Sequence, residues 1–227
     1  HLHVHSQYSL LDGQASVTGL VDKAMALDMP GFALTDHGNM FGIKELANYV
    51  GKVKKKYKGK IEDARKRLED APESEREALR PEVEAEIAKY ERKLKFKPIF
   101  GCEMYVAKGS LTDRSDKSDK GRHLVVLAKN LKGYKNLIKI VSQAHTEGFY
   151  HHPRTDKEAL AAHREGLIVC SACLGGEIPR LIATGQLEEA DRQVKWFKDT
   201  FGDDYYIELQ RHKTDMPGAN RDTYVEQ

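Results

Sequence analysis

Short apolar blocks recur along the 227 residues, and their periodicity predicts alternating strands and helices. Runs rich in apolar and β-branched residues that are bounded by turn residues are typical of strands. The predicted strands are His1–His5, Gly31–Thr35, Pro98–Val106, His123–Ala128, Leu167–Ser171 and Tyr205–Leu209.

Between these strands, apolar residues return every three or four positions, which predicts amphipathic helices. Ser16 is expected to cap a helix that ends near Leu27, since its hydroxyl can accept a backbone N–H. Further helices are predicted over Leu131–Ala144, Lys157–His163, Glu177–Ala183 and Leu187–Thr200. This alternation predicts a parallel sheet with crossover helices and favours an α/β barrel. The strands are too few to close a barrel, so we expect the carboxyl end to be missing.

Residues 40–97 break this rhythm, because Lys, Glu, Arg and Ala dominate them. Ala71-Pro72-Glu73-Ser74 predicts a helix stop followed by a new helix start. Opposite charges at helical spacing, such as Glu62 and Lys66, favour a solvated helical hairpin. An arm that docks a protein or contacts DNA is the alternative. The polar loop Lys108–Gly121 is expected to be flexible.

Composition narrows the class of protein. A chain with 40% hydrophobic residues can bury one α/β core, so a single domain over residues 1–227 is expected. Its 37 Lys+Arg against 35 Asp+Glu predict no overall attraction to nucleic acid. The apolar runs are short and no leader is recognisable, so we expect a soluble cytoplasmic protein. The odd set of three cysteines fits a reducing compartment. The start at His1, inside a motif, suggests a segment of something longer.

Potential metal ligands follow several predicted strands. In His1-Leu2-His3-Val4-His5 the imidazoles alternate, so in a strand they share one face and can hold a cation. An accidental polar strand face is the alternative. Asp36-His37-Gly38 ends the next strand at the sheet edge where α/β barrels place active sites. Cys102 and Glu103 come from a third strand, and Glu103 could bridge two cations.

Other polar residues extend this set. Asp12 lies in a turn and suits a second cation, although Asp-Gly is more often only a turn. His123 begins the fourth strand, and Cys173 after the fifth is a soft ligand suited to Zn. Cys170 is expected in the core. The remaining histidines are expected to be structural or exposed, with His145 the least certain: His145, His151, His152, His163 and His212.

The ordered motifs resemble the PHP (polymerase and histidinol phosphatase) superfamily. The resemblance rests on His3-Val4-His5-Ser6, Tyr8–Gly13, Thr35–Gly42 and Gly101-Cys102-Glu103. His123–Asn130, Glu147–Tyr150, Cys173–Ile178 and Tyr206–Gln210 are similar to the branch found in bacterial DNA polymerase III alpha subunits.

This resemblance implies a distorted seven-stranded (β/α) barrel, with residues 40–97 as an insertion, and a cluster of two or three divalent cations (Zn, Mn or Mg). The implied metal ligands are His3, His5, Asp12, His37, Glu103, His123 and Cys173. His1 is then an extra, structural member of the opening triplet. The family's final Asp-x-His motif has no counterpart before Gln227.

The activity implied for the domain is 3′–5′ exonuclease hydrolysis of phosphodiesters, with Arg154 as a phosphate clamp. An ion pair of Arg154 with Asp156 is the alternative for that residue. A second hypothesis is a metal-stabilised docking module that recruits a separate proofreading exonuclease, and a small-molecule phosphatase ranks last. The implied parent chain is a DNA-directed DNA polymerase, a nucleotidyltransferase of DNA replication. Its implied partners are primer–template DNA, the exonuclease subunit, the sliding clamp and the clamp loader.

Overall fold

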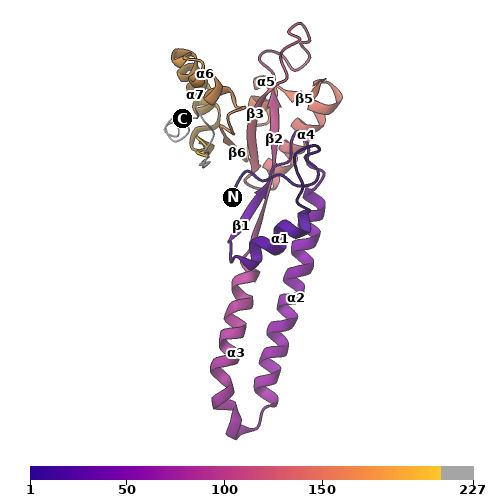
Figure 1. Ribbon diagram of the computed structural model, residues 1–227, viewed down its shortest axis with the longest axis vertical. Helices are drawn as coiled ribbons and strands as arrows, with labels where there is room; N and C mark the ends of the chain where they lie inside the picture. The colour runs from indigo at the N-terminus through magenta and orange to yellow at the C-terminus, as the bar shows by residue number, and fades with distance from the viewer. Residues whose placement is uncertain (211–227) are drawn as a thin grey trace, which may run out of the picture. The chain divides into compact units, whose positions relative to one another are not determined.

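A computed structural model describes residues 1–210 of the chain (Figure 1). The chain divides into two compact units. Unit 1 comprises His1–Leu34 and Phe41–Ile99, and unit 2 comprises Thr35–Met40 and the chain from Phe100 onward.

Unit 1 begins with an irregular segment and then folds into helix α1 (Val17–Ala26) and strand β1 (Gly31–Leu34). The Ser16 cap is confirmed, because its hydroxyl accepts the N–H of Gly19 at 3.1 Å. The predicted strand over His1–His5 is wrong. The carbonyl of His1 accepts the N–H of Ala33 in β1 at 2.9 Å, and the chain then bends. Residues 1–5 therefore form no strand beside β1.

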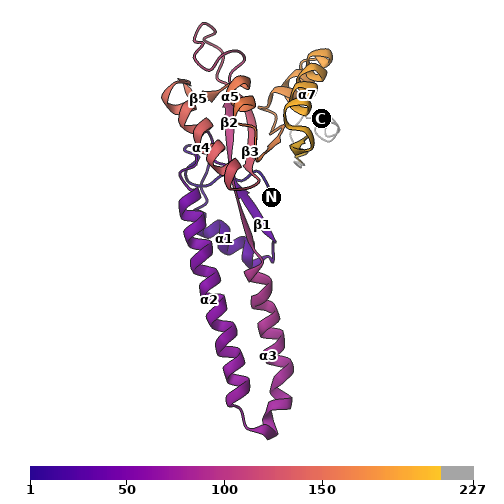
Figure 2. The same cartoon turned by 180° about the vertical axis from the view of Figure 1, so that it is seen from behind.

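Two long helices follow, α2 (Ile43–Asp70) and α3 (Glu73–Leu94), and they run side by side in both views (Figures 1 and 2). The predicted break is confirmed at Ala71 and Pro72, although no side chain caps α3. The rings of Tyr57 and Tyr90 stack between the helices with centroids 5.5 Å apart. That these helices are an insertion stays a prediction.

Unit 2 is built on a mixed sheet in the order β4-β5-β2-β3-β6-β7. The strands are β2 (Lys97–Val106), β3 (Arg122–Ala128), β4 (Phe149–Tyr150), β5 (His152–Thr155), β6 (Leu167–Cys170) and β7 (Tyr205–Tyr206). The prediction of a parallel sheet is wrong, because β3 lies antiparallel to both β2 and β6. Parallel pairing occurs between β2 and β5 and between β6 and β7. Closure into a barrel stays a prediction.

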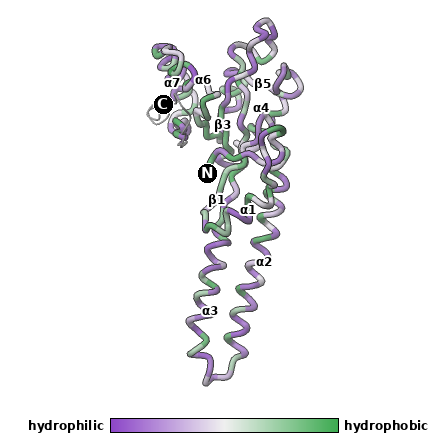
Figure 3. Tube along the Cα trace, viewed as in Figure 1, coloured by the Kyte–Doolittle hydropathy of each residue, from purple (hydrophilic) through white to green (hydrophobic). Residues whose placement is uncertain are grey.

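Helices α4 (Leu131–Thr146), α5 (Lys157–Ala162), α6 (Glu177–Ala183) and α7 (Leu187–Phe201) agree closely with the predicted ranges, and a 3₁₀ turn (Gly202–Asp204) precedes β7. Asn130 and Asp156 cap α4 and α5 by accepting backbone N–H groups. Helix α4 packs against β3 and β5, whereas α7 packs against β6 and β7. The apolar core therefore lies between the sheet and these helices, where Figure 3 shows β3 as strongly hydrophobic.

Two strands were not predicted from the sequence. β4 and β5 are short, and β5 reads His-Pro-Arg-Thr, so neither has the apolar run that identifies a strand. Within residues 1–210, no helix has both the length and the apolar character required to cross a membrane.

Candidate metal centre

The antiparallel pairing of β2 with β3 sorts their side chains onto two faces. Tyr105 lies opposite His123 in the register, and Glu103 is two residues away on the same strand. Because side chains alternate along a strand, Glu103, Tyr105 and His123 share one face of the sheet. Cys102, Met104 and Leu124 point to the other face and join the core. The alternation thus directs polar side chains to one face of β2 and β3.

The segment Thr35–Met40 brings His37 to this face. The N–H of Glu103 donates to the carbonyl of Asp36 at 3.1 Å, and the N–H of Gly38 donates to the carbonyl of Glu103 at 2.8 Å. Gly38 has a φ of 61°, which a glycine adopts without strain. A Cβ at Gly38 would approach Pro153 Cγ to 2.7 Å, so space also requires glycine.

The carboxylate of Glu103 is the centre of the arrangement, and its side chain is only 1% exposed. Its Oε2 lies 2.7 Å from Nδ1 of His37, and its Oε1 lies 2.8 Å from Nδ1 of His123. One potential ligand atom from each of these residues falls within 4.8 Å of the other two. A buried carboxylate that faces two imidazoles is a donor set suited to Zn or Mn, so these residues fit a divalent cation.

Cys173 joins this group from the turn after β6. Its Sγ lies 3.5 Å from Glu103 Oε1 and 3.5 Å from His123 Nδ1, and it accepts the N–H of Gly175 at 3.4 Å. Ala172 adopts a φ of 63° in the turn that delivers this cysteine. The structure therefore brings together four of the seven expected ligands, namely His37, Glu103, His123 and Cys173.

The charge of His123 responds to these neighbours. Hydrogen bonds to Cys173 and Glu103 stabilise the imidazolium more than burial penalises it, which raises the pKa of His123 to about 9. Without a cation, a proton on His123 thus partly compensates the buried carboxylate. A cation that binds Nδ1 has to replace that proton, as expected of a metal ligand.

The two other cysteines lie in the core. Burial raises the pKa of the Cys170 thiol to about 11 and raises the pKa of Cys102 still further. This confirms the prediction that Cys170 is a core residue.

Alkylation should distinguish Cys173 from these core thiols. With iodoacetamide under native conditions, we expect Cys173 to react first, because it is half-buried whereas Cys102 and Cys170 are buried. Adding Zn should slow labelling of Cys173 at least about tenfold, since a bound thiolate is not available as a nucleophile. Peptide mass spectrometry over time measures each site. Equal labelling of Cys173 with and without Zn contradicts its role as a ligand.

Sequence analysis did not predict that the rings of Tyr105 and His152 lie on the same face of the sheet as Glu103. The ring of His152 stacks on Tyr105 with centroids 4.4 Å apart, and Tyr105 meets His123 edge to face at 5.2 Å. Burial, with a smaller contribution from Lys120, lowers the pKa of His152 and favours the neutral ring. His152 was expected to be only structural or exposed. Strand β5 pairs in parallel with β2. Predicting β5 as a strand beside β2 would therefore have indicated that His152 lies near Tyr105.

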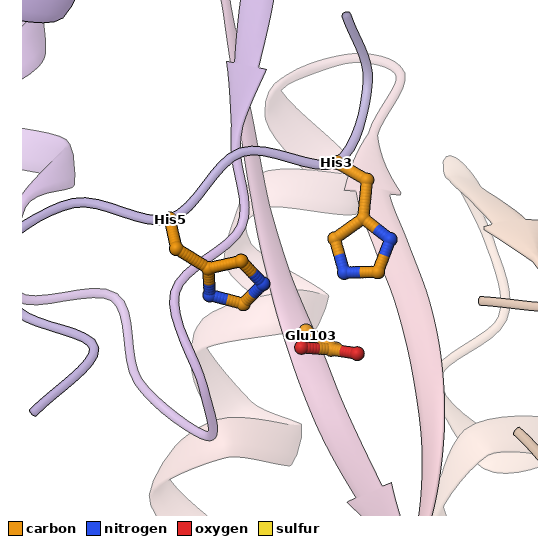
Figure 4. Close-up of side chains that lie close together, drawn as sticks. All are labelled: His3, His5 and Glu103. Carbon is orange, nitrogen blue, oxygen red and sulfur yellow. The ribbon is translucent and has the colours of Figure 1, made fainter. Parts of the chain in front are cut away.

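His3 and His5 belong to unit 1. Their rings lie 5.2 Å apart, and Nδ1 of His5 is 2.8 Å from the hydroxyl of Ser9. Figure 4 shows both imidazoles projecting from the same side of the amino-terminal segment, and it also draws the carboxylate of Glu103 on β2. Asp12 is exposed in the turn that follows. The ligand roles of His3, His5 and Asp12 stay predictions.

Arg154 is fully buried, and its contacts differ from both alternatives considered for it. Its guanidinium donates to Asp119 Oδ2 at 3.1 Å and to backbone carbonyls of Leu111 and Asp113. The alternative of an ion pair with Asp156 is wrong, because that carboxylate caps α5 and accepts the N–H of Leu111. Arg154 thus holds the loop Lys108–Gly121, which was expected to be flexible.

Among the other histidines, His145 makes one specific contact. Its Nε2 lies 2.8 Å from the carbonyl of Gly38, next to His37. His151 is exposed and His163 ends α5, in agreement with their assignment as structural or exposed residues. His212 lies outside the described residues.

Comparison with known proteins gives the family. The model of the family described as "PHP domain" matches residues 1–212. The chain belongs to the PHP domain family. This confirms the resemblance that the motifs indicated.

Relatives within this family are named DNA polymerase III subunit alpha. The protein of Borreliella burgdorferi is 42% identical over 93% of this chain, and that of Treponema pallidum is 41% identical over 95%. The protein of Aquifex aeolicus is 36% identical over 97%. The chain spans only about 15% of the length of these relatives.

Proposed function

We propose that the chain is the PHP domain of a bacterial replicative DNA polymerase, that it binds divalent cations, and that it hydrolyses phosphodiesters at DNA 3′ ends. The observation that carries this proposal is the Glu103 carboxylate, whose two oxygens face His37 and His123 with Cys173 alongside. Membership of the PHP family and similarity to DNA polymerase III alpha subunits support it. The proposed setting is DNA replication in the bacterial cytoplasm.

Divalent cations held by these residues would supply a Lewis acid for phosphate and lower the pKa of a bound water. The residues of the chain then have separate tasks. Glu103 is held rigidly by β2 and fixes the position of the imidazoles of His37 and His123. The rings of Tyr105 and His152 border the same face and limit the access of water. Because imidazole and thiolate are the softer donors here, Zn is favoured over Mg.

His3, His5 and Asp12 are proposed as further cation ligands. Two imidazoles on the same side of one segment can hold a cation together, and both belong to a motif on which the resemblance to PHP proteins rests. Replacing His3 and His5 with alanine should lower the number of Zn ions bound per chain. An unchanged metal content, measured by elemental analysis after dialysis, contradicts this assignment.

The nuclease proposal is tested on a primer with a mismatched 3′ end. The full-length protein is incubated with Mn or Zn and without deoxynucleotides, and shortened primers are resolved by gel electrophoresis. We expect His123→Ala to reduce excision at least about 100-fold, because the loss of one ligand disturbs the geometry of the proposed metal site. His163→Ala, on the C-terminal cap of α5, is the matched control and should retain activity.

The outcomes separate the two proposed roles. Excision that is lost only in His123→Ala supports an exonuclease. Absence of excision in the wild type, with cations still bound, overturns the nuclease and leaves the metal-stabilised docking module, in which bound metal contributes folding energy.

A further inference from the structure

The charges of the paired helices α2 and α3 are segregated along their length. Residues 43–60 of α2 and 87–94 of α3 hold ten lysines and arginines but only two glutamates, Glu45 and Glu91. Residues 61–86, which include the turn, hold ten acidic residues against five basic ones. One end of the helix pair is therefore strongly positive and the turn end is negative.

Lysines of α2 make up the densest part of the positive end, which we call the lysine segment: Lys52, Lys54, Lys55, Lys56, Lys58 and Lys60. The first and last of these are about 12 Å apart along the helix at a rise of ~1.5 Å per residue. Lys52, Lys55 and Lys56 are exposed, and they share a helix face because they lie three and four positions apart. Figure 3 shows how hydrophilic both helices are.

These lysines are not neutralised within the chain. In the part that the structure describes, no lysine from Lys52 to Lys58 makes an ion pair, whereas Arg65 and Arg67 of the same helix pair with glutamates of α3. Lys60 lies over the ring of Tyr90 instead. Like charges three and four residues apart destabilise a helix. Helix stability therefore does not account for this segment.

We infer that the lysine segment is a sequence-independent contact surface for the phosphate backbone of DNA. Lysine is a flexible point charge suited to phosphate, and such contacts bind without reading bases. Lysine is depleted from protein–protein interfaces, which favours DNA over an acidic protein as the partner. The negative turn end repels phosphates, so DNA is expected to contact only the positive end.

The surroundings leave room for such a contact. Lys44 and Lys52 line a surface cavity of about 530 Å³ together with Phe41 and Tyr49. Gly51 and Gly59 have nothing within 4 Å of where a Cβ would stand, so the helix backbone is also accessible. Phosphates can therefore approach the lysines without rearrangement of unit 1.

The test measures DNA binding by the 227-residue chain in EDTA, so that its result does not depend on the proposed cation site. A fluorescein-labelled primer–template duplex is titrated at about 50 mM salt and at several higher concentrations, and anisotropy is recorded. Lys52→Gln, Lys55→Gln and Lys56→Gln are combined in one variant. Lys132→Gln, Lys135→Gln and Lys139→Gln, also exposed on one helix, form the matched control.

The triple variant in α2 should lose affinity at least about tenfold and flatten the slope of log affinity against log salt by about two to three. The control in α4 should change affinity less than about threefold. Equal losses in both variants overturn the inference, because net charge alone then explains binding. It is also overturned if the wild type fails to bind the duplex or if the α2 variant binds as tightly as the wild type. Circular dichroism verifies that both variants keep their helices.

Discussion

Replacing Arg154 with alanine should lower the free energy of unfolding by about 3–5 kcal/mol, because it leaves the buried carboxylate of Asp119 without its cation. The guanidinium also donates to the carbonyls of Leu111 and Asp113, so the variant removes several hydrogen bonds at once. Thermal unfolding followed by circular dichroism should show a decrease in Tm of roughly 10 °C. Arg164→Ala is the control, since Arg164 is exposed and, within residues 1–210, its side chain donates only to Ala161 of its own turn.

A second measurement separates a structural Arg154 from a phosphate clamp. If Arg154 holds the loop Lys108–Gly121, its removal should loosen the loop backbone, and trypsin should cleave after the already exposed Arg114, Lys117 and Lys120 about tenfold faster or more. If Arg154 instead clamps phosphate, Arg154→Ala keeps its stability and its slow proteolysis but loses excision. The latter result refutes the structural role assigned here.

The positions of helices could be predicted well because their signals are local. Ser16, Asn130 and Asp156 accept N–H groups three residues ahead, and such caps can be recognised from the residues themselves. Strand direction is different, because it depends on which distant segment each strand meets. Strand β3 reads as one apolar run whether its neighbours are parallel or antiparallel, so the sequence alone favoured the wrong sheet type.

The residues of the candidate site also divide into those that the sequence could predict and those that it could not. His37, Glu103, His123 and Cys173 could be predicted because polar residues next to apolar strands are unusual and the order of motifs resembles a known family. His152 and the true partner of Arg154 could not be predicted. His152 contacts Tyr105 only because β5 lies beside β2, and Asp119 reaches Arg154 from a loop 35 residues away in sequence. Such tertiary contacts produce no recognisable pattern in the sequence near the residues involved.

Glu103→Gln should weaken Zn binding to the chain at least about 100-fold, which is the strongest expected effect of a single substitution on the site. Glutamine has nearly the same size but carries no charge, and its amide nitrogen is a donor rather than a ligand. The carboxylate it replaces is 1% exposed and faces both His37 and His123, so its loss removes the anionic group that lies between the two imidazoles.

Two readouts measure this effect. Competition with a chromophoric chelator gives the Zn affinity, and the rise in Tm upon addition of Zn reports binding to the folded state. We expect the wild type to gain stability with Zn and Glu103→Gln to gain almost none, while Glu165→Gln, at an exposed carboxylate paired with Lys132, behaves as the wild type. If Glu103→Gln binds Zn as tightly as the wild type, the cation is held elsewhere and the cluster of His37, Glu103, His123 and Cys173 is not the metal site. If affinity is lost while the cation-free fold is retained, the buried carboxylate is the central ligand, and its rigid placement on β2 is what makes the site possible.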